Sequence, residues 1–368
     1  MNERSLTETH RRNNFDFVRL LFAACVIVTH AYPLAGSQEC DWLCQASHGQ
    51  YTFSWIAVRG FFVISGYLIF QSLERSKNLV DYYWKRVLRL YPALIVVLTL
   101  TVLLGPFVYH SEIPYWSNES VKSYIPKNLG LYHLQFAITG IFEQNPHKYA
   151  INGSLWTIAF EFTMYVAVSV FFFIKGKRSI VLIIVSLIYL TLAKLAVFNF
   201  AEIQQWNFVI LDWYLIELGV YFAAGSLLAV LRIQQLPVRY LAIIFVVSLA
   251  LFIFATGRSE FLTVSVTMLP LSILCGCLCP VVGISSISKY IGDLSYGMYI
   301  YGFPVQQTLV YYFKLDHVGL IIGGLTISAL FAYASWHLIE APALKWKNIK
   351  LWKNKKSLTE VTSPNVNP

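Results

Sequence analysis

Charged side chains are scarce in this sequence. Asp, Glu, Lys and Arg make up 13% of its 368 residues, whereas hydrophobic residues make up 57%, and the mean hydropathy is +0.58. Soluble globular domains usually carry about a quarter charged residues. The scarcity of charge excludes an ordinary soluble domain and indicates a protein that crosses a membrane several times.

Several binding and catalytic patterns are missing as well. The stretch from Gly60 to Gly66 lacks the Lys-Ser/Thr pair of a phosphate-binding loop, and Ser65 has no nucleophile-elbow pattern around it. Cys275, Cys277 and Cys279 follow one another in steps of two, which does not gather three thiols on one helical face. These absences count against a nucleotide loop, a serine hydrolase and a metal site.

Ten apolar runs are long enough to form membrane-crossing helices. They span residues 15–35, 55–73, 90–110, 154–174, 180–198, 209–231, 239–256, 261–282, 294–313 and 318–339. The first run is not expected to be a cleaved signal peptide, because it carries two charges near its start. The sequence predicts an all-α polytopic membrane protein, a bundle of about ten transmembrane helices.

The basic residues are distributed unevenly between the connecting segments. With residues 1–14 in the cytoplasm, twenty of the 28 basic residues fall on the inside and five on the outside. This bias favours two cytoplasmic termini. It also explains the net charge of +9 without nucleic acid, so membrane lipid is the expected surroundings. We expect a cytoplasmic segment 1–14, a transmembrane domain 15–344, and a basic, disordered tail 345–368.

The first apolar run carries three ionisable side chains, although charge in hydrocarbon is costly. Asp16, Arg19 and His30 share one stripe of a helix, with Arg19 and His30 roughly 20° apart around the axis. Along the axis these two are roughly 16 Å apart, about half the hydrocarbon thickness. His30 is the leading candidate for a general base. The alternative is a histidine that is hydrogen-bonded to a neighbouring helix.

Two arginines precede the third apolar run. Arg86 and Arg89, three residues apart, share a helical face at the inner surface, with Lys85 beside them. Guanidinium groups bind phosphate oxygens well, so this face could hold a phosphate-bearing donor from the cytosol. Anchoring to anionic lipid headgroups is the alternative.

The fourth run places a carboxylate, Glu161, in the middle of the membrane. It could pair with a cation, orient His30, or accept a hydrogen bond from a hydroxyl substrate. A purely structural ion pair with Arg59 is the alternative. Asp212 and Glu217 are expected to be structural.

Two outer segments complete the pattern. Cys40 and Cys44 lie in the first outer loop and could pair if that compartment is oxidising, which the sequence leaves open. The longest outer segment, 111–153, is too polar to span the membrane and could supply a lid or an acceptor surface.

Taken together, these stretches resemble the acyltransferase-3 family of bacterial integral-membrane acyltransferases. The matching elements are the Arg-x10-His helix with its preceding Asp (Asp16, Arg19, His30), residues 60–66, Arg86 and Arg89, Ser154-Leu155-Trp156 with Glu161, residues 294–299, and Glu340–Leu344. Gly302 and Ala341 depart from the family pattern, because many members have His and Arg there.

The resemblance implies an O-acyltransferase, most commonly an O-acetyltransferase. Acetyl-CoA or another acyl-CoA would be the donor, and a hydroxyl of a cell-envelope carbohydrate, lipid-linked or polymeric, would be the acceptor. His30, Glu161 and Asp16 would be catalytic, Arg19, Arg86 and Arg89 would bind the donor, and no metal would be needed. A transporter or flippase for a glycolipid or small anion, and a non-catalytic partner of a glycan-export machine, are the competing interpretations.

The topology can be tested with reporter fusions. We expect a reporter that is active only in the cytoplasm to work when fused after Pro368, because of the twenty-to-five bias of basic residues. Activity of a periplasm-specific reporter at the same position would overturn the predicted orientation.

Overall fold

The computed structural model of the chain describes residues 13–148, 150–198, 213–281 and 283–348, and these are largely helical. Among them there is no β-strand, only one isolated bridge between Tyr109 and Ile141. The long helices are α2 (Phe15–Leu34), α4 (Phe53–Arg75), α5 (Leu79–Leu104), α7 (Trp156–Ser169), α8 (Arg178–Phe198), α10 (Trp213–Val230), α11 (Val238–Ala255), α12 (Phe261–Leu278), α14 (Ser295–Phe313) and α15 (His317–Ser335). The shorter helices are α3 (Trp42–Ala46), α6 (Glu119–Leu129), α13 (Ile287–Ile291) and α16 (Ala341–Lys345).

Nine helical segments of the described chain are long and apolar enough to cross a membrane. They contain α2, α4, α5, α7, α8, α10, α11, α12 and α15, some with short turns beside them. The expected all-α, multi-pass membrane class is therefore confirmed. The expected run 294–313 does form a helix, α14, but it is not among the nine; it carries Gln306, Gln307 and several tyrosines, and most of its residues are buried.

Parts of the expected domain division lie outside the described residues. These parts are residues 1–12, the start of the sixth run with Asp212, and the tail from 349 onward. Before the tail, α16 and a turn at Trp346–Asn348 continue the helical structure past residue 344.

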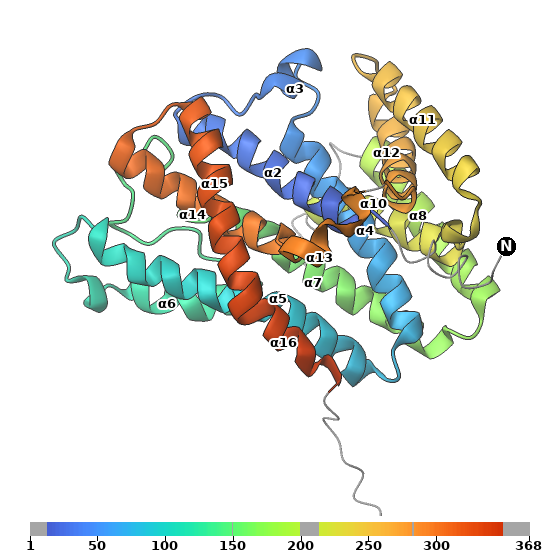
Figure 1. Ribbon diagram of the computed structural model, residues 1–368, viewed down its shortest axis with the longest axis horizontal. Coiled ribbons are helices and arrows are strands. Elements are labelled where there is room, and N and C mark those ends of the chain that lie inside the picture. The colour runs from blue at the N-terminus through green and yellow to red at the C-terminus, as the bar shows by residue number, and fades with distance from the viewer. Residues whose placement is uncertain (1–12, 149, 199–212, 282, 349–368) are drawn as a thin grey trace, which may run out of the picture.

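Helix α4 is the centre of the bundle (Figure 1). It packs against α2 on one side and against α10 and α12 on the other, while α14 packs between α2 and α15. Two glycines set the spacing of α4 and α10. A Cβ on Gly66 would lie 2.0 Å from the Phe222 carbonyl oxygen, and a Cβ on Gly225 would lie 2.0 Å from that of Val63. The absence of a side chain at these two positions therefore lets the two helices come into close contact.

The third long helix begins earlier than its apolar run suggests. Asn78 caps α5, its side-chain oxygen accepting a hydrogen bond from the Asp81 amide at 2.8 Å. Arg86 and Arg89 are consequently inside this helix, near its start, and not ahead of it. The expectation that the helix starts at residue 90 is wrong, because the cap allows it to extend into a polar stretch that hydropathy alone does not assign to a span.

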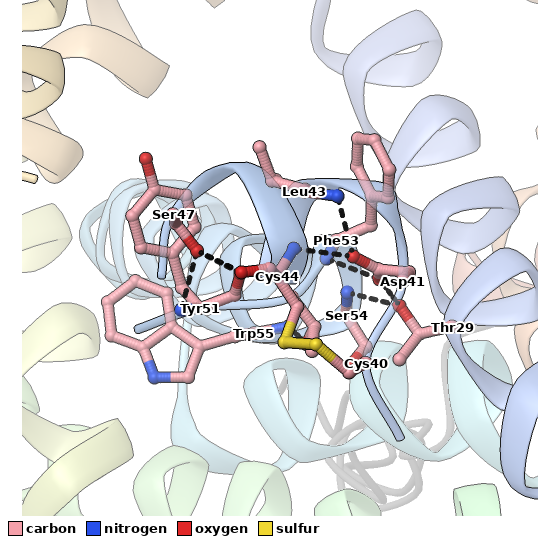
Figure 2. The surroundings of a disulfide bond; sticks show 11 residues. Thr29, Cys40, Asp41, Leu43, Cys44, Ser47, Tyr51, Phe53, Ser54 and Trp55 are labelled. Carbon is pink, nitrogen blue, oxygen red and sulfur yellow. Dashed lines mark hydrogen bonds between the residues drawn. A yellow bond between two sulfur atoms is a disulfide. The ribbon is translucent and has the colours of Figure 1, made fainter. Parts of the chain in front are cut away.

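A buried carboxylate fixes the loop between α2 and α4 (Figure 2). Asp41, fully buried, accepts hydrogen bonds from the amides of Leu43, Cys44 and Phe53 and from the Thr29 hydroxyl at 2.5 Å. The structure also contains a disulfide between Cys40 and Cys44, which answers the question that the sequence left open. Because Thr29 belongs to α2, this network ties the loop to the helix end that carries His30.

We predict that Asp41→Ala destabilises the protein by about 3 kcal/mol. The change leaves several buried donors without their charged acceptor, and each such loss is costly. The midpoint of thermal unfolding in detergent measures the effect. Glu39→Ala is the matched control, because Glu39 is exposed in the same loop. Equal midpoints for the two variants would contradict the role assigned to Asp41.

Candidate active site

A basic cavity of about 560 Å³ opens at the end of the bundle where α4 finishes and α5 begins. We call this end of the bundle the basic end. The cations that line the cavity are Arg19, Arg75, Lys85, Arg86, Arg89 and Lys347. The predicted face of Arg86 and Arg89 thus contributes to a cavity, and Arg19 of α2 joins it from a distant part of the sequence.

Two of these cations are bound by one carboxylate. Asp293, just before α14, accepts hydrogen bonds from Arg19 Nη1 at 2.9 Å and from Arg89 Nη2 at 2.6 Å, both at Oδ2. Its other oxygen accepts the Ser295 hydroxyl at 2.5 Å. Burial alone would raise the pKa of Asp293, but the two guanidinium groups and Ser295 hold it well below its ordinary value. Sequence reasoning assigned no role to Asp293.

A second carboxylate stands behind Arg89. Glu340 is buried in a π-helical turn, Trp336–Glu340, and one of its oxygens accepts the Ser335 hydroxyl at 3.0 Å. Its other oxygen is 3.9 Å from Arg89 Nη1. The positive charge of Arg89 is therefore largely neutralised by Asp293 and Glu340.

Arg86 differs from its neighbours in having no carboxylate partner among the described residues. Its Nη2 donates to the Ser72 hydroxyl at 3.1 Å, and its buried Nε has no hydrogen-bond partner. Lys85, by contrast, is paired with Asp81 at 2.8 Å. Of the three predicted donor-binding arginines, Arg86 is the one whose charge is available to a ligand.

Glu161 lies in the wall of the same cavity. Its Oε1 accepts hydrogen bonds from Ser65 at 2.7 Å and from the Tyr165 hydroxyl. The alternative of an ion pair with Arg59 is wrong, because Arg59 instead pairs with Glu217 and stacks on Trp55 at 3.8 Å. The expected structural role of Glu217 is confirmed by this pair.

A narrower cavity of about 50 Å³ adjoins the basic one on the side towards the middle of the bundle. The two share Arg19, Ser65 and Glu161, and the narrow one reaches Thr157 and Tyr299, whose hydroxyls are 2.8 Å apart. Thr157 is one turn closer than Glu161 to the start of α7, which follows the long loop. The narrow cavity therefore points towards the opposite end of the bundle.

His30 lies at that opposite end, partly buried and outside the walls of both cavities. Its ring contacts Phe303 of α14 edge to face, with centroids 5.3 Å apart. His147, from the long loop, makes a similar contact with Phe303 at 5.8 Å. Sequence reasoning missed His147, because no helical periodicity links an irregular loop to α2.

The remaining predicted catalytic residue, Asp16, is near the basic end of α2. It is partly buried and makes no hydrogen bond or ion pair with the described residues. Fourteen helical positions separate it from His30, roughly 21 Å along the axis. The structure does not bring these two side chains together.

The departure at Gly302 has a packing reason. A Cβ at this position would lie 2.7 Å from Cγ1 of Ile27, one turn before His30 on α2. Gly153, before α7, similarly leaves room for the Phe303 ring, 2.7 Å from the place of a Cβ. The small residues let α2, α14 and the start of α7 meet around Phe303.

Known proteins resemble this chain along most of its length. A family model described as an acyltransferase domain, that of the acyltransferase-3 family, matches residues 12–337. An O-acetyl transferase of Shigella phage Sf6 is 31% identical over 350 residues, covering 93% of this chain and 99% of the phage protein. Nodulation protein 10 of Rhizobium leguminosarum bv. viciae is 28% identical over 369 residues, covering 91% and 94%. No solved structure matches the chain.

Proposed function

Because this chain belongs to the acyltransferase-3 family, an assignment that makes it a membrane acyltransferase, we propose that it moves an acetyl group from cytosolic acetyl-CoA to a carbohydrate hydroxyl. The acceptor is a carbohydrate of the bacterial cell envelope, handled at the outer face of the inner membrane. One observation carries the proposal: a basic cavity at one end shares Glu161 with a narrow cavity, which lies on the side of the end that carries the partly buried His30.

The orientation follows from two independent features. The basic end holds Arg75, Arg86 and Lys347, as expected of a cytosolic face. The opposite end carries the disulfide between Cys40 and Cys44, which suits an oxidising compartment. The CoA phosphates therefore meet the basic cavity from the cytosol.

Within the basic cavity, Arg86 is the principal phosphate ligand, since Asp293 holds Arg19 and Arg89. These two arginines form part of the cavity wall and contribute weaker contacts to the phosphates of the donor. The pantetheine arm runs through the narrow cavity, where Glu161 can accept a hydrogen bond from a donor amide.

The chemical step takes place beside His30. His30 removes the proton of the acceptor hydroxyl as its oxygen attacks the thioester carbonyl. The C–S bond then breaks, the acetyl ester remains on the carbohydrate, and the protonated imidazole returns the proton to the CoA thiolate. To reach His30, the thioester passes Tyr299 and moves along α14 by one more turn, roughly 6 Å, as far as Phe303.

The first test concerns donor binding. Replacing Arg86 with Ala removes a charged hydrogen-bond donor worth about 1.5–3 kcal/mol, so the KM for acetyl-CoA should rise by about one to two orders of magnitude. Lys85→Ala is the control, because Lys85 is already paired with Asp81. Arg89→Ala should weaken donor binding too, but it also lowers stability by leaving buried Asp293 with one guanidinium. An Arg86→Ala protein that binds CoA like the parent would make Arg86 a lipid anchor instead.

The second test concerns the base. His30→Gln keeps size and hydrogen bonding but cannot take up a proton near pH 7, so kcat should fall about 10²–10⁴-fold with the acetyl-CoA KM little changed. Release of CoA thiol in the presence of envelope carbohydrate measures turnover per folded molecule. A variant that retains more than about a tenth of the parental kcat would rule out His30 as the base.

A further inference from the structure

His147 sits on a segment that α14 holds firmly. Gln307 of α14 donates from its side-chain amide to the carbonyl oxygens of His147 and Ala150, both at 2.6 Å. Asn145, two residues before His147, donates back to the Gln307 side chain at 2.7 Å and to its carbonyl at 2.9 Å. Both amide side chains are buried, so the loop is fixed at this point by four hydrogen bonds.

The same segment rests on the end of α2. Pro146 lies beside Gly36, where a Cβ would be 3.3 Å from the proline Cβ. Phe303, one helical turn before Gln307 on α14, contacts the imidazoles of both His147 and His30. Three parts of the chain thus converge to place two histidines around one aromatic ring.

The fold uses the backbone of His147, but not its imidazole nitrogens. Within the described residues, His147 takes part in hydrogen bonding only through its carbonyl, and neither imidazole is hydrogen-bonded there. Polar atoms that are partly buried without a protein partner are normally satisfied by water or a ligand. Burial lowers the pKa of His147, so near neutral pH its ring is uncharged, with one nitrogen donating and the other accepting.

We propose that His147 is an acceptor-binding residue, which hydrogen-bonds one hydroxyl of the carbohydrate while His30 deprotonates the hydroxyl that reacts. A carbohydrate suits this pair, because its hydroxyls occur close together and each both donates and accepts. Phe303 supplies an apolar wall between the two contacts. This assignment rests on the proposed function and adds to it the residue that selects the acceptor.

The test uses the full-length protein in detergent, radiolabelled acetyl-CoA, and carbohydrate extracted from the envelope of the bacterium that produces the protein as the titrated acceptor. His147→Phe keeps a ring against Phe303 but removes both nitrogens, so the acceptor KM should rise about tenfold while the acetyl-CoA KM stays at the parental value. His147→Gln should recover part of the loss. Lys148→Ala, at the exposed neighbouring position, should behave like the parent.

Three results would overturn the assignment. A parental acceptor KM in His147→Phe would show that the imidazole does not bind the carbohydrate. A loss shared equally between the two KM values, with a lowered unfolding midpoint and no recovery in His147→Gln, would show a structural role. If the parent itself transfers no label, the proposed function fails and the role of His147 fails with it, whereas the first two results leave the proposed function standing.

Discussion

Asp293 holds together the basic end of this membrane protein. Its carboxylate binds the guanidinium groups of Arg19 from α2 and Arg89 from α5. It also accepts a hydrogen bond from the hydroxyl of Ser295, in the first turn of α14. A buried carboxylate such as Asp293 is costly unless it is paired, so the position of each of the three helices depends on the other two. The pairing occupies two of the three predicted donor-binding arginines, Arg19 and Arg89, and leaves the third, Arg86, without a carboxylate partner among the described residues.

Helices α2 and α14 link the two ends of the molecule. Each begins at the Asp293 cluster and runs past the narrow cavity to the region of His30 and Phe303. The phosphates of a donor and the hydroxyl of an acceptor could therefore be held on opposite sides of one membrane by the same two helices. The hydrogen bonds around Asp41 and around Gln307 fix the end that carries His30, as those of Asp293 fix the basic end.

Local patterns in the sequence predicted much of this architecture. Hydrophobic runs located the helices, and helical spacing put Arg19 and His30 on one stripe of α2, with Arg86 and Arg89 on one face of α5. Local patterns do not show which residues from distant segments of the chain pair with each other. The carboxylates that bind Arg19 and Arg59 lie 274 and 158 positions away, and His147 belongs to a loop without periodicity. The sequence also suggested Arg59 as a partner for Glu161, because both are charged residues within apolar runs. In the structure, the hydroxyls of Ser65 and Tyr165 donate hydrogen bonds to that carboxylate instead.

The central claim is that donor and acceptor meet from opposite sides of the membrane, and it can be measured directly in sealed vesicles with the basic end facing outward. Radiolabelled acetyl-CoA, which does not cross the bilayer, is added outside, and envelope carbohydrate is trapped in the lumen. The account predicts labelled acetyl esters on the lumenal carbohydrate, with CoA released outside. Labelling only when donor and carbohydrate share one compartment would contradict it.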